Sequence, residues 1–92
     1  MIQSFRDEDT RGVFDGSGCR RWASIERVAR RKLDQMEAAS ALDELRVPPG
    51  DRLEALKGNR EGQYSIRIND QYRICFEWQM DGAYGVEIAD YH

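Results

Sequence analysis

The sequence of 92 residues is poor in the features that mark metal-binding, secreted and membrane proteins: it has one histidine, two cysteines and two prolines. No apolar run reaches membrane-spanning length, and the start, Met1 to Arg6, lacks the apolar run of a signal peptide. We therefore expect a cytoplasmic protein that does not contact a membrane. Cys19 and Cys75 lack CxxC spacing and have one histidine to join them, so we expect reduced thiols, no metal site and no cofactor.

The length suits one compact domain, which we place at residues 1–92. Aromatic residues make up 10% of the chain, which favours a folded protein over a disordered one. The net charge of -3 argues against a surface that binds nucleic acid all over, because phosphate affinity comes from basic side chains. One stretch is nevertheless locally basic and holds a single acid, Glu26; its cations are Arg20, Arg21, Arg27, Arg30, Arg31 and Lys32.

The run Val47-Pro48-Pro49-Gly50 separates a helical half from a strand half, because neither a helix nor a central strand continues through two prolines. Before it, residues 2–5 fit a short first strand and residues 7–14 fit a short helix. From residue 22 onward, apolar residues recur at helical spacing and share one side, namely Trp22, Ile25, Ala29, Leu33 and Met36. Arg20, Arg27 and Arg31 fall on the opposite side, which is therefore predicted to be basic.

Three segments alternate apolar and polar residues with a period of two, at 64–68, 72–78 and 86–91. A two-residue turn at 69–70 would mix the two sets of side chains, whereas a three-residue connection at 69–71 keeps them apart. That register pairs Ile66 with Ile74, directs one apolar face toward the helices and sets Arg67 opposite Arg73. The sequence thus predicts an α+β fold with N-terminal helices packed on one face of a small, mainly antiparallel sheet.

The polar face of this sheet is the first candidate for chemistry. Two arginines that face each other repel, so Arg67 and Arg73 either turn into solvent, meet an acid such as Glu87 of the last strand, or bind an anion. The last strand also places Tyr91 on this face, next to His92, which is the one imidazole of the chain. The basic side of the helix has two interpretations as well, a solvated surface or a phosphate-binding one, for which arginine is the preferred side chain.

Two runs of sequence resemble the HigB toxins: residues 52–76, RLEALKGNREGQYSIRINDQYRICF, and residues 86–92, VEIADYH. The most specific parts are LKG followed by the YSIRIN-QYRICF hairpin, and the closing DYH, and the resemblance extends over nearly the whole chain. It implies a compact RelE-like fold whose active site lies on the sheet face away from the helices. It also implies a toxin that cuts messenger RNA in the ribosomal decoding site, without metal, by attack of the ribose 2′-hydroxyl on the adjacent phosphate.

The resemblance further implies roles and partners. Lys57 and Arg73 would stabilise phosphate charge, and Asp90, Tyr91 and His92 would position the nucleotide and transfer protons. The strand register points to Arg73 and Tyr91 independently. We expect a HigA-like helix-turn-helix antitoxin to neutralise the toxin, and this antitoxin, rather than the toxin, to bind operator DNA. We also expect Arg67 and Glu54 to contact substrate, and ribosomal RNA to be bound by Arg20, Arg27, Arg30 and Arg31.

Several alternatives remain open at this point. Some HigB toxins carry a histidine where this chain has Glu54, so either Glu54 serves as a base or the activity is weaker. Lys57 also fits a solvated loop lysine, and Asp90 fits a residue that ends a strand. RelE-like toxins include poisons of DNA gyrase, and the basic helix alone would suit a non-catalytic RNA-binding or interaction module.

Overall fold

The structure is a computed structural model that describes residues 1–90. Two α-helices, α1 (Glu8–Asp15) and α2 (Glu26–Ala38), precede four strands, β1 (Glu54–Ala55), β2 (Tyr64–Arg67), β3 (Tyr72–Gln79) and β4 (Gly82–Asp90). Short 3-10 turns at Arg20–Trp22, Leu42–Arg46, Pro49–Asp51 and Gly58–Arg60 connect these elements. No helix within the described residues is long and apolar enough to cross a membrane.

Local interactions set the ends of the helices. Asp7 caps α1 by accepting a hydrogen bond from the Thr10 amide at 2.7 Å, and Gly16 ends it in a left-handed conformation with φ of 87°. The predicted helix from residue 22 is confirmed for the most part, but α2 begins at Glu26 and Arg20 lies outside it, in a separate 3-10 turn. The reason is tertiary: Trp22 is buried with its ring 5.4 Å from that of Tyr72, and Ile25 leaves the helical path with φ of -120° and ψ of 4°.

The four strands form one antiparallel sheet in the order β1-β2-β3-β4. The predicted register is confirmed: Ile66 pairs with Ile74, and Arg67 lies opposite Arg73. The sequence pattern missed the two-residue β1 and the first residues of β4. The strand expected at 2–5 is reduced to isolated parallel bridges beside β4, where a side chain on Gly82 would come within 1.9 Å of the Met1 carbonyl oxygen.

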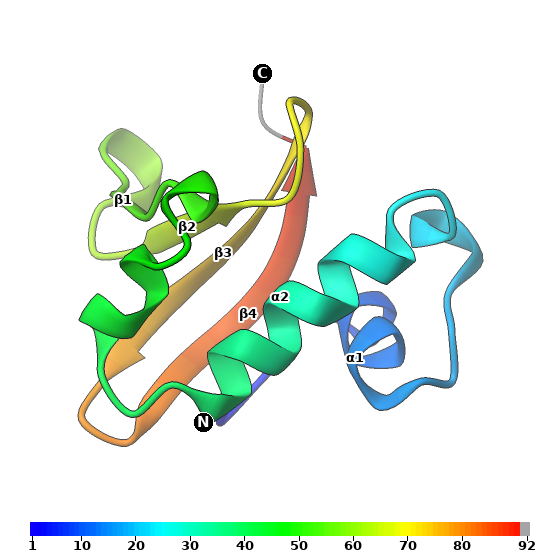
Figure 1. Cartoon of the computed structure of the whole chain (residues 1–92), viewed down its shortest axis with the longest axis horizontal. Helices are drawn as coiled ribbons and strands as arrows, with labels where there is room; N and C mark the ends of the chain where they lie inside the picture. Colours follow the sequence, from blue (N-terminus) through cyan, green and yellow to red (C-terminus); the bar gives the residue numbers. More distant parts are fainter. Residues whose placement is uncertain (91–92) are drawn as a thin grey trace.

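The hydrophobic core lies between the sheet and the two helices, and Figure 1 shows α2 crossing one face of the sheet with α1 beside it. The predicted apolar side of the helix is buried throughout, as are most inward residues of the strands, whereas the inward Tyr64 and Tyr72 are partly buried against the core. The buried residues include Trp22, Ile25, Ala29, Leu33 and Met36 from the helical half, and Ile66, Ile68, Ile74, Phe76 and Ile88 from the strand half. Period-two alternation therefore leaves the opposite face of the sheet for polar side chains.

Replacement of Leu33 by alanine tests this packing, because Leu33 is 0% exposed. We expect Leu33→Ala to lower the free energy of unfolding by about 3 kcal/mol, from lost burial and the cavity that remains. The measurement is urea unfolding followed by circular dichroism. Met80→Ala is the matched control, because Met80 is 103% exposed and its loss should change stability by less than about 0.5 kcal/mol. Equal effects of the two substitutions would contradict this core.

Candidate active site

The polar face of the sheet carries two rows of paired residues. Ser65, Cys75 and Glu87 form one row across β2, β3 and β4, and Arg67, Arg73 and Ala89 form the next. These residues alternate with the buried isoleucines of the same strands, so they lie on the face away from α1 and α2. This is the face on which the site was predicted.

Arg73 is held firmly on this face, with 11% of its side chain exposed. Its Nε donates a hydrogen bond to Ser65 Oγ at 2.7 Å, and its Nη2 donates to the Arg52 carbonyl oxygen at 2.8 Å. The Nη2 atom also lies 3.8 Å from Glu54 Oε1. The facing arginines avoid each other because Arg67 turns toward Asp70 in the hairpin loop, where the two form an ion pair. Arg73 therefore does not splay into solvent.

Glu87 has cationic partners other than the facing arginines. Its Oε2 atom lies 3.1 Å from Arg6 Nε and 3.1 Å from Arg60 Nη1, with 14% of its side chain exposed. The hydrogen bond to Glu87 raises the pKa of Arg60. Of the alternatives for the facing arginines, the pairing with Glu87 is not the one that the structure shows, since Glu87 pairs with Arg6 and Arg60.

A small pocket of about 120 Å³ opens between the β1–β2 connection and strands β3 and β4. It brings together Lys57 and Asp90, two of the predicted site residues, and it is also lined by Leu56, Arg60, Cys75 and Ala89. Asp90 further accepts a hydrogen bond from Gln71 Nε2 at 3.3 Å. Burial raises the pKa of the Cys75 thiol, although nearby arginines oppose that rise. The pocket therefore combines cations, a carboxylate and a protonated thiol.

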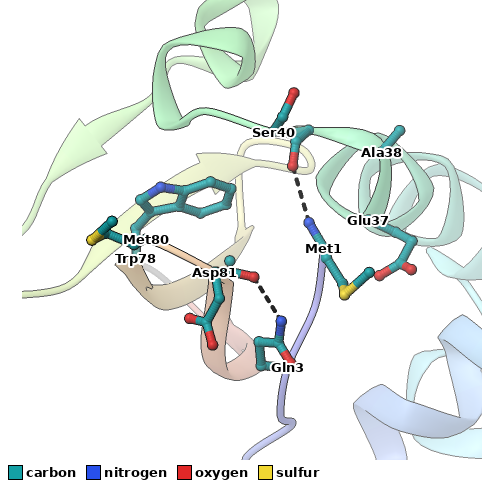
Figure 2. A pocket seen from close by; sticks show the side chains of 10 residues that line it. Met1, Gln3, Glu37, Ala38, Ser40, Trp78, Met80 and Asp81 are labelled. Carbon is teal, nitrogen blue, oxygen red and sulfur yellow. Dashed lines mark hydrogen bonds between the residues drawn. The ribbon is translucent and has the colours of Figure 1, made fainter.

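A larger hollow of about 430 Å³ lies at the other end of the molecule, between Met1, the end of α2 and the β3–β4 turn. Figure 2 shows its apolar side chains, Trp78 and Met80, and the hydrogen bond of 2.6 Å from Gln3 Nε2 to the Asp81 carbonyl oxygen. Within residues 1–90, no lysine or arginine lines it. Phosphate chemistry needs cations, so the smaller polar pocket is the better candidate site.

The structure thus brings three of the predicted site residues, Glu54, Lys57 and Arg73, to the polar face of the sheet. Asp90 lines the pocket beside Lys57, but it pairs with Tyr72 in the alternation of the inward residues, and its carboxylate contacts Gln71 of the hairpin turn. Arg67 shares that face but points to the hairpin loop. Tyr91 and His92, for which we predicted roles in catalysis, lie outside the described residues.

The sequence matches a known family over residues 3–92, described as the RelE-like toxin of type II toxin-antitoxin system HigB. This chain belongs to the HigB-like toxin family. Toxin HigB-1 of Vibrio cholerae serotype O1 is 52% identical over 82 residues, which are 89% of this chain and 79% of that protein. Endoribonuclease HigB of Proteus vulgaris is 31% identical over 94 residues, which cover the whole of both chains.

Solved structures confirm the RelE-like fold of this HigB-like toxin. The YoeB-YefM complex from Staphylococcus aureus matches with a TM-score of 0.57 at 16% identity, covering 100% of this chain and 98% of that one. The YoeB/ParE toxin from Agrobacterium tumefaciens matches with a TM-score of 0.56 at 15% identity, covering 99% and 98%. At such low identity the likeness concerns the fold alone.

The basic surface of the toxin is smaller than the sequence suggested. Arg27, Arg30 and Arg31 are exposed on the outer side of α2, around a shallow hollow that Glu26 and Asp34 also line. Arg20 is exposed in the preceding turn. Lys32, counted with this basic stretch, is instead buried in an ion pair with Asp51. These arginines belong to α2, which covers the face of the sheet opposite to the one that carries the polar pocket.

Other residues of the site were not anticipated. Ser65 and Arg60 carry contacts that depend on partners far along the chain, namely Arg73 and Glu87. A signal for Ser65 existed, because strand alternation places it on the face of Arg67. Arg60 lies in an irregular connection, where no periodicity could have indicated its direction.

The Cys75 thiol offers a chemical test of the pocket. Thiolates are the form that reacts with alkylating reagents, so burial and a raised pKa should make Cys75 react slowly in the folded toxin. In a Cys19→Ser variant, labelling by iodoacetamide at pH 7.5 should be at least about tenfold slower than in urea, as followed by mass spectrometry. Equal rates in the folded and unfolded protein would show that the floor of the pocket is open to reagents.

Proposed function

We propose that this HigB-like toxin is an endoribonuclease that cuts messenger RNA on the ribosome, by attack of a ribose 2′-hydroxyl on the adjacent phosphate. The observation that carries the proposal is the gathering of Lys57, Arg73 and Glu54 on the polar face of the sheet, with Asp90 at the edge of the pocket that Lys57 lines. The name of the Proteus vulgaris relative, Endoribonuclease HigB, points to the same reaction. Such a reaction needs cations for the phosphate, a base for the hydroxyl proton and an acid for the leaving oxygen.

Arg73 and Lys57 supply the cations. Negative charge develops on the non-bridging phosphate oxygens during attack, and a fixed, largely buried guanidinium stabilises that charge better than a solvated one. Because side chains provide this charge, the proposed reaction uses no metal ion and no cofactor. We place the toxin in the cytoplasm, together with the ribosome. The ribosome would hold the message in the orientation needed for attack, which so small a protein cannot set by itself.

Carboxylates and the C-terminal residues are the proposed proton carriers. Glu54 Oε1 lies 3.8 Å from Arg73 Nη2. If Arg73 binds the phosphate, Glu54 is close enough to act as the base for the adjacent ribose hydroxyl. Asp90 lines the pocket beside Lys57. We assign Tyr91 and His92 to the same task, as leaving-group acid or nucleotide contacts, and Arg67 to the RNA that continues past the hairpin.

A RelE-like toxin that poisons DNA gyrase would not need this set of phosphate and proton groups. A module that binds RNA through the helix alone is also disfavoured, because the buried Lys32 and the neighbouring Glu26 and Asp34 weaken its basic surface. We retain Arg20, Arg27, Arg30 and Arg31 as contacts to ribosomal RNA. By family, a HigA-like helix-turn-helix antitoxin is the proposed partner that neutralises the toxin and binds operator DNA.

Arg73→Ala tests the phosphate-binding role directly. Loss of a preorganised charge donor typically costs about 3 kcal/mol, so single-turnover cleavage of ribosome-bound message should slow about a hundredfold and growth inhibition should be relieved. Association with the ribosome should stay as in the parent. Arg46→Ala is the matched control, because Arg46 is exposed and pairs with the nearby Asp43. Cleavage by Arg73→Ala at the parental rate would refute the assignment.

The basic surface of α2 has a separate test. Replacing Arg27, Arg30 and Arg31 together by glutamate should weaken ribosome association and make it less dependent on salt, because fewer cations replace counterions on the RNA. Sedimentation binding assays across a range of salt concentrations measure both effects. Arg46→Glu, compared with each of the three single reversals in α2, controls for the change of net charge. Unchanged ribosome binding by the triple variant would mean that this surface is only solvated.

A further inference from the structure

A buried ion pair in the middle of α2 takes no part in the proposed mechanism. Lys32 is 8% exposed and Asp51 is 0% exposed, and the pair joins α2 to the 3-10 turn Pro49–Asp51. The second carboxylate oxygen, Asp51 Oδ2, is buried without a hydrogen-bond partner among residues 1–90. Buried ion pairs are often no more stabilising than apolar side chains of similar size. Stability alone is therefore a poor reason for charges at this place.

The residue that follows Asp51 shows what the pair holds. Arg52 has a left-handed backbone, with φ of 47° and ψ of 57°, which costs a residue other than glycine about 1 kcal/mol. Such a conformation persists where its surroundings fix it, and it is common next to functional groups. In this conformation, the Arg52 carbonyl oxygen accepts a hydrogen bond of 2.8 Å from Arg73 Nη2. Asp51, the buried anchor, and the carbonyl group that accepts from the Arg73 guanidinium thus belong to adjacent residues of the chain.

Ser65 fixes the same guanidinium from β2. Its side chain is 0% exposed, and its Oγ accepts a hydrogen bond of 2.7 Å from Arg73 Nε. A guanidinium is planar, so acceptors at Nε and at Nη2 together set both its position and the orientation of its plane. One acceptor comes from the sheet and the other from the segment that Lys32 and Asp51 anchor to α2.

We propose that Ser65, Asp51 and Lys32 are positioning residues for Arg73: Ser65 fixes its Nε, and the buried pair fixes the Arg52 carbonyl that receives its Nη2. This inference rests on the proposed function, because these residues act through the cation assigned to the phosphate. Misplacing a reacting group by about 1 Å can slow an enzyme about a hundredfold, so such support has a measurable effect on the rate.

Ser65→Ala is the first test, made in the full chain. It removes the acceptor and leaves the backbone in place, so single-turnover cleavage of ribosome-bound message should slow by at least about tenfold while ribosome affinity stays parental. Ser65→Thr keeps the hydroxyl on a residue suited to strands and should recover most of the rate. Ser40→Ala, at an exposed serine, is the matched control. A parental rate in Ser65→Ala would overturn the proposal.

A double-mutant cycle separates positioning from a general loss of stability. Lysine has no guanidinium group and therefore no Nε–H that could donate to Ser65 Oγ. In an Arg73→Lys background the Ser65→Ala change should therefore alter the cleavage rate less than about twofold. An effect that persists in full in that background would overturn the positioning role. If Arg73→Ala itself cleaves at the parental rate, the proposed function fails; if Arg73→Ala is slow but Ser65→Ala is not, this inference alone fails.

The ion pair is tested by removing both charges at once. Lys32→Met with Asp51→Leu avoids a lone buried charge, so the variant should fold, as judged by circular dichroism, yet cleave at least about tenfold more slowly with parental ribosome affinity. Lys32→Gln with Asp51→Asn, which also leaves no lone buried charge and keeps side chains that can hydrogen-bond, is the second variant should the first not fold. A folded variant of either kind that cleaves at the parental rate would remove the pair from the positioning of Arg73.

Discussion

Strands β2, β3 and β4 pair in one register through residues 73–75 of β3, before the shift of the β3–β4 pairing between Cys75 and Glu77, and the face of the polar groups on these strands follows from it. Ile66, Ile74 and Ile88 form a row that the helices cover, and the alternate residues necessarily face the other way. A slip of one residue would exchange the faces, placing Arg73 under α2 and the isoleucines in solvent. The free energy of burying the isoleucines therefore also fixes the face on which the cations gather.

The polar face also carries charged side chains that are largely shielded from water, namely Arg73 and Glu87. Both have long-range partners: Glu87 with Arg6 and Arg60, and Arg73 with Ser65 and the Arg52 carbonyl. A protein of net charge -3 thus presents a locally cationic pocket of about 120 Å³. Local charge of this kind suits a toxin whose substrate is delivered by a larger partner better than one that must capture free RNA.

Much of the fold was predictable because its signals are periodic. The apolar side of the helix and the β2–β3 register follow from spacing alone, and both are confirmed. The two-residue β1 and the 3-10 turns of the described residues carry no periodic signal. The burial of Lys32, one of the cations of the basic stretch, was not foreseen, because its partner, Asp51, lies 19 residues away. Contacts of that range depend on the tertiary structure, which a local pattern does not specify.

The candidate site shows the same difference between residues that a local pattern indicates and residues whose role depends on long-range contacts. The register indicated Arg73, and resemblance to the HigB toxins indicated Lys57, Glu54 and Asp90. The structure brings Arg73, Lys57 and Glu54 to the polar face and places Asp90 at the edge of the pocket. Ser65 and Arg60 were missed because their significance lies in partners on other strands or connections. Their contacts show that the support of the site is spread through the chain, from α2 to β4.

The most direct measurement of the central claim is a structure of the toxin on a ribosome whose message carries a 2′-O-methyl group at the cleavage position, which blocks the nucleophile. The account predicts that the scissile phosphate lies on the polar face of the sheet, within hydrogen-bond distance of the Arg73 guanidinium, about 3 Å. A message bound along α2, or a phosphate that Arg73 does not contact, would contradict it.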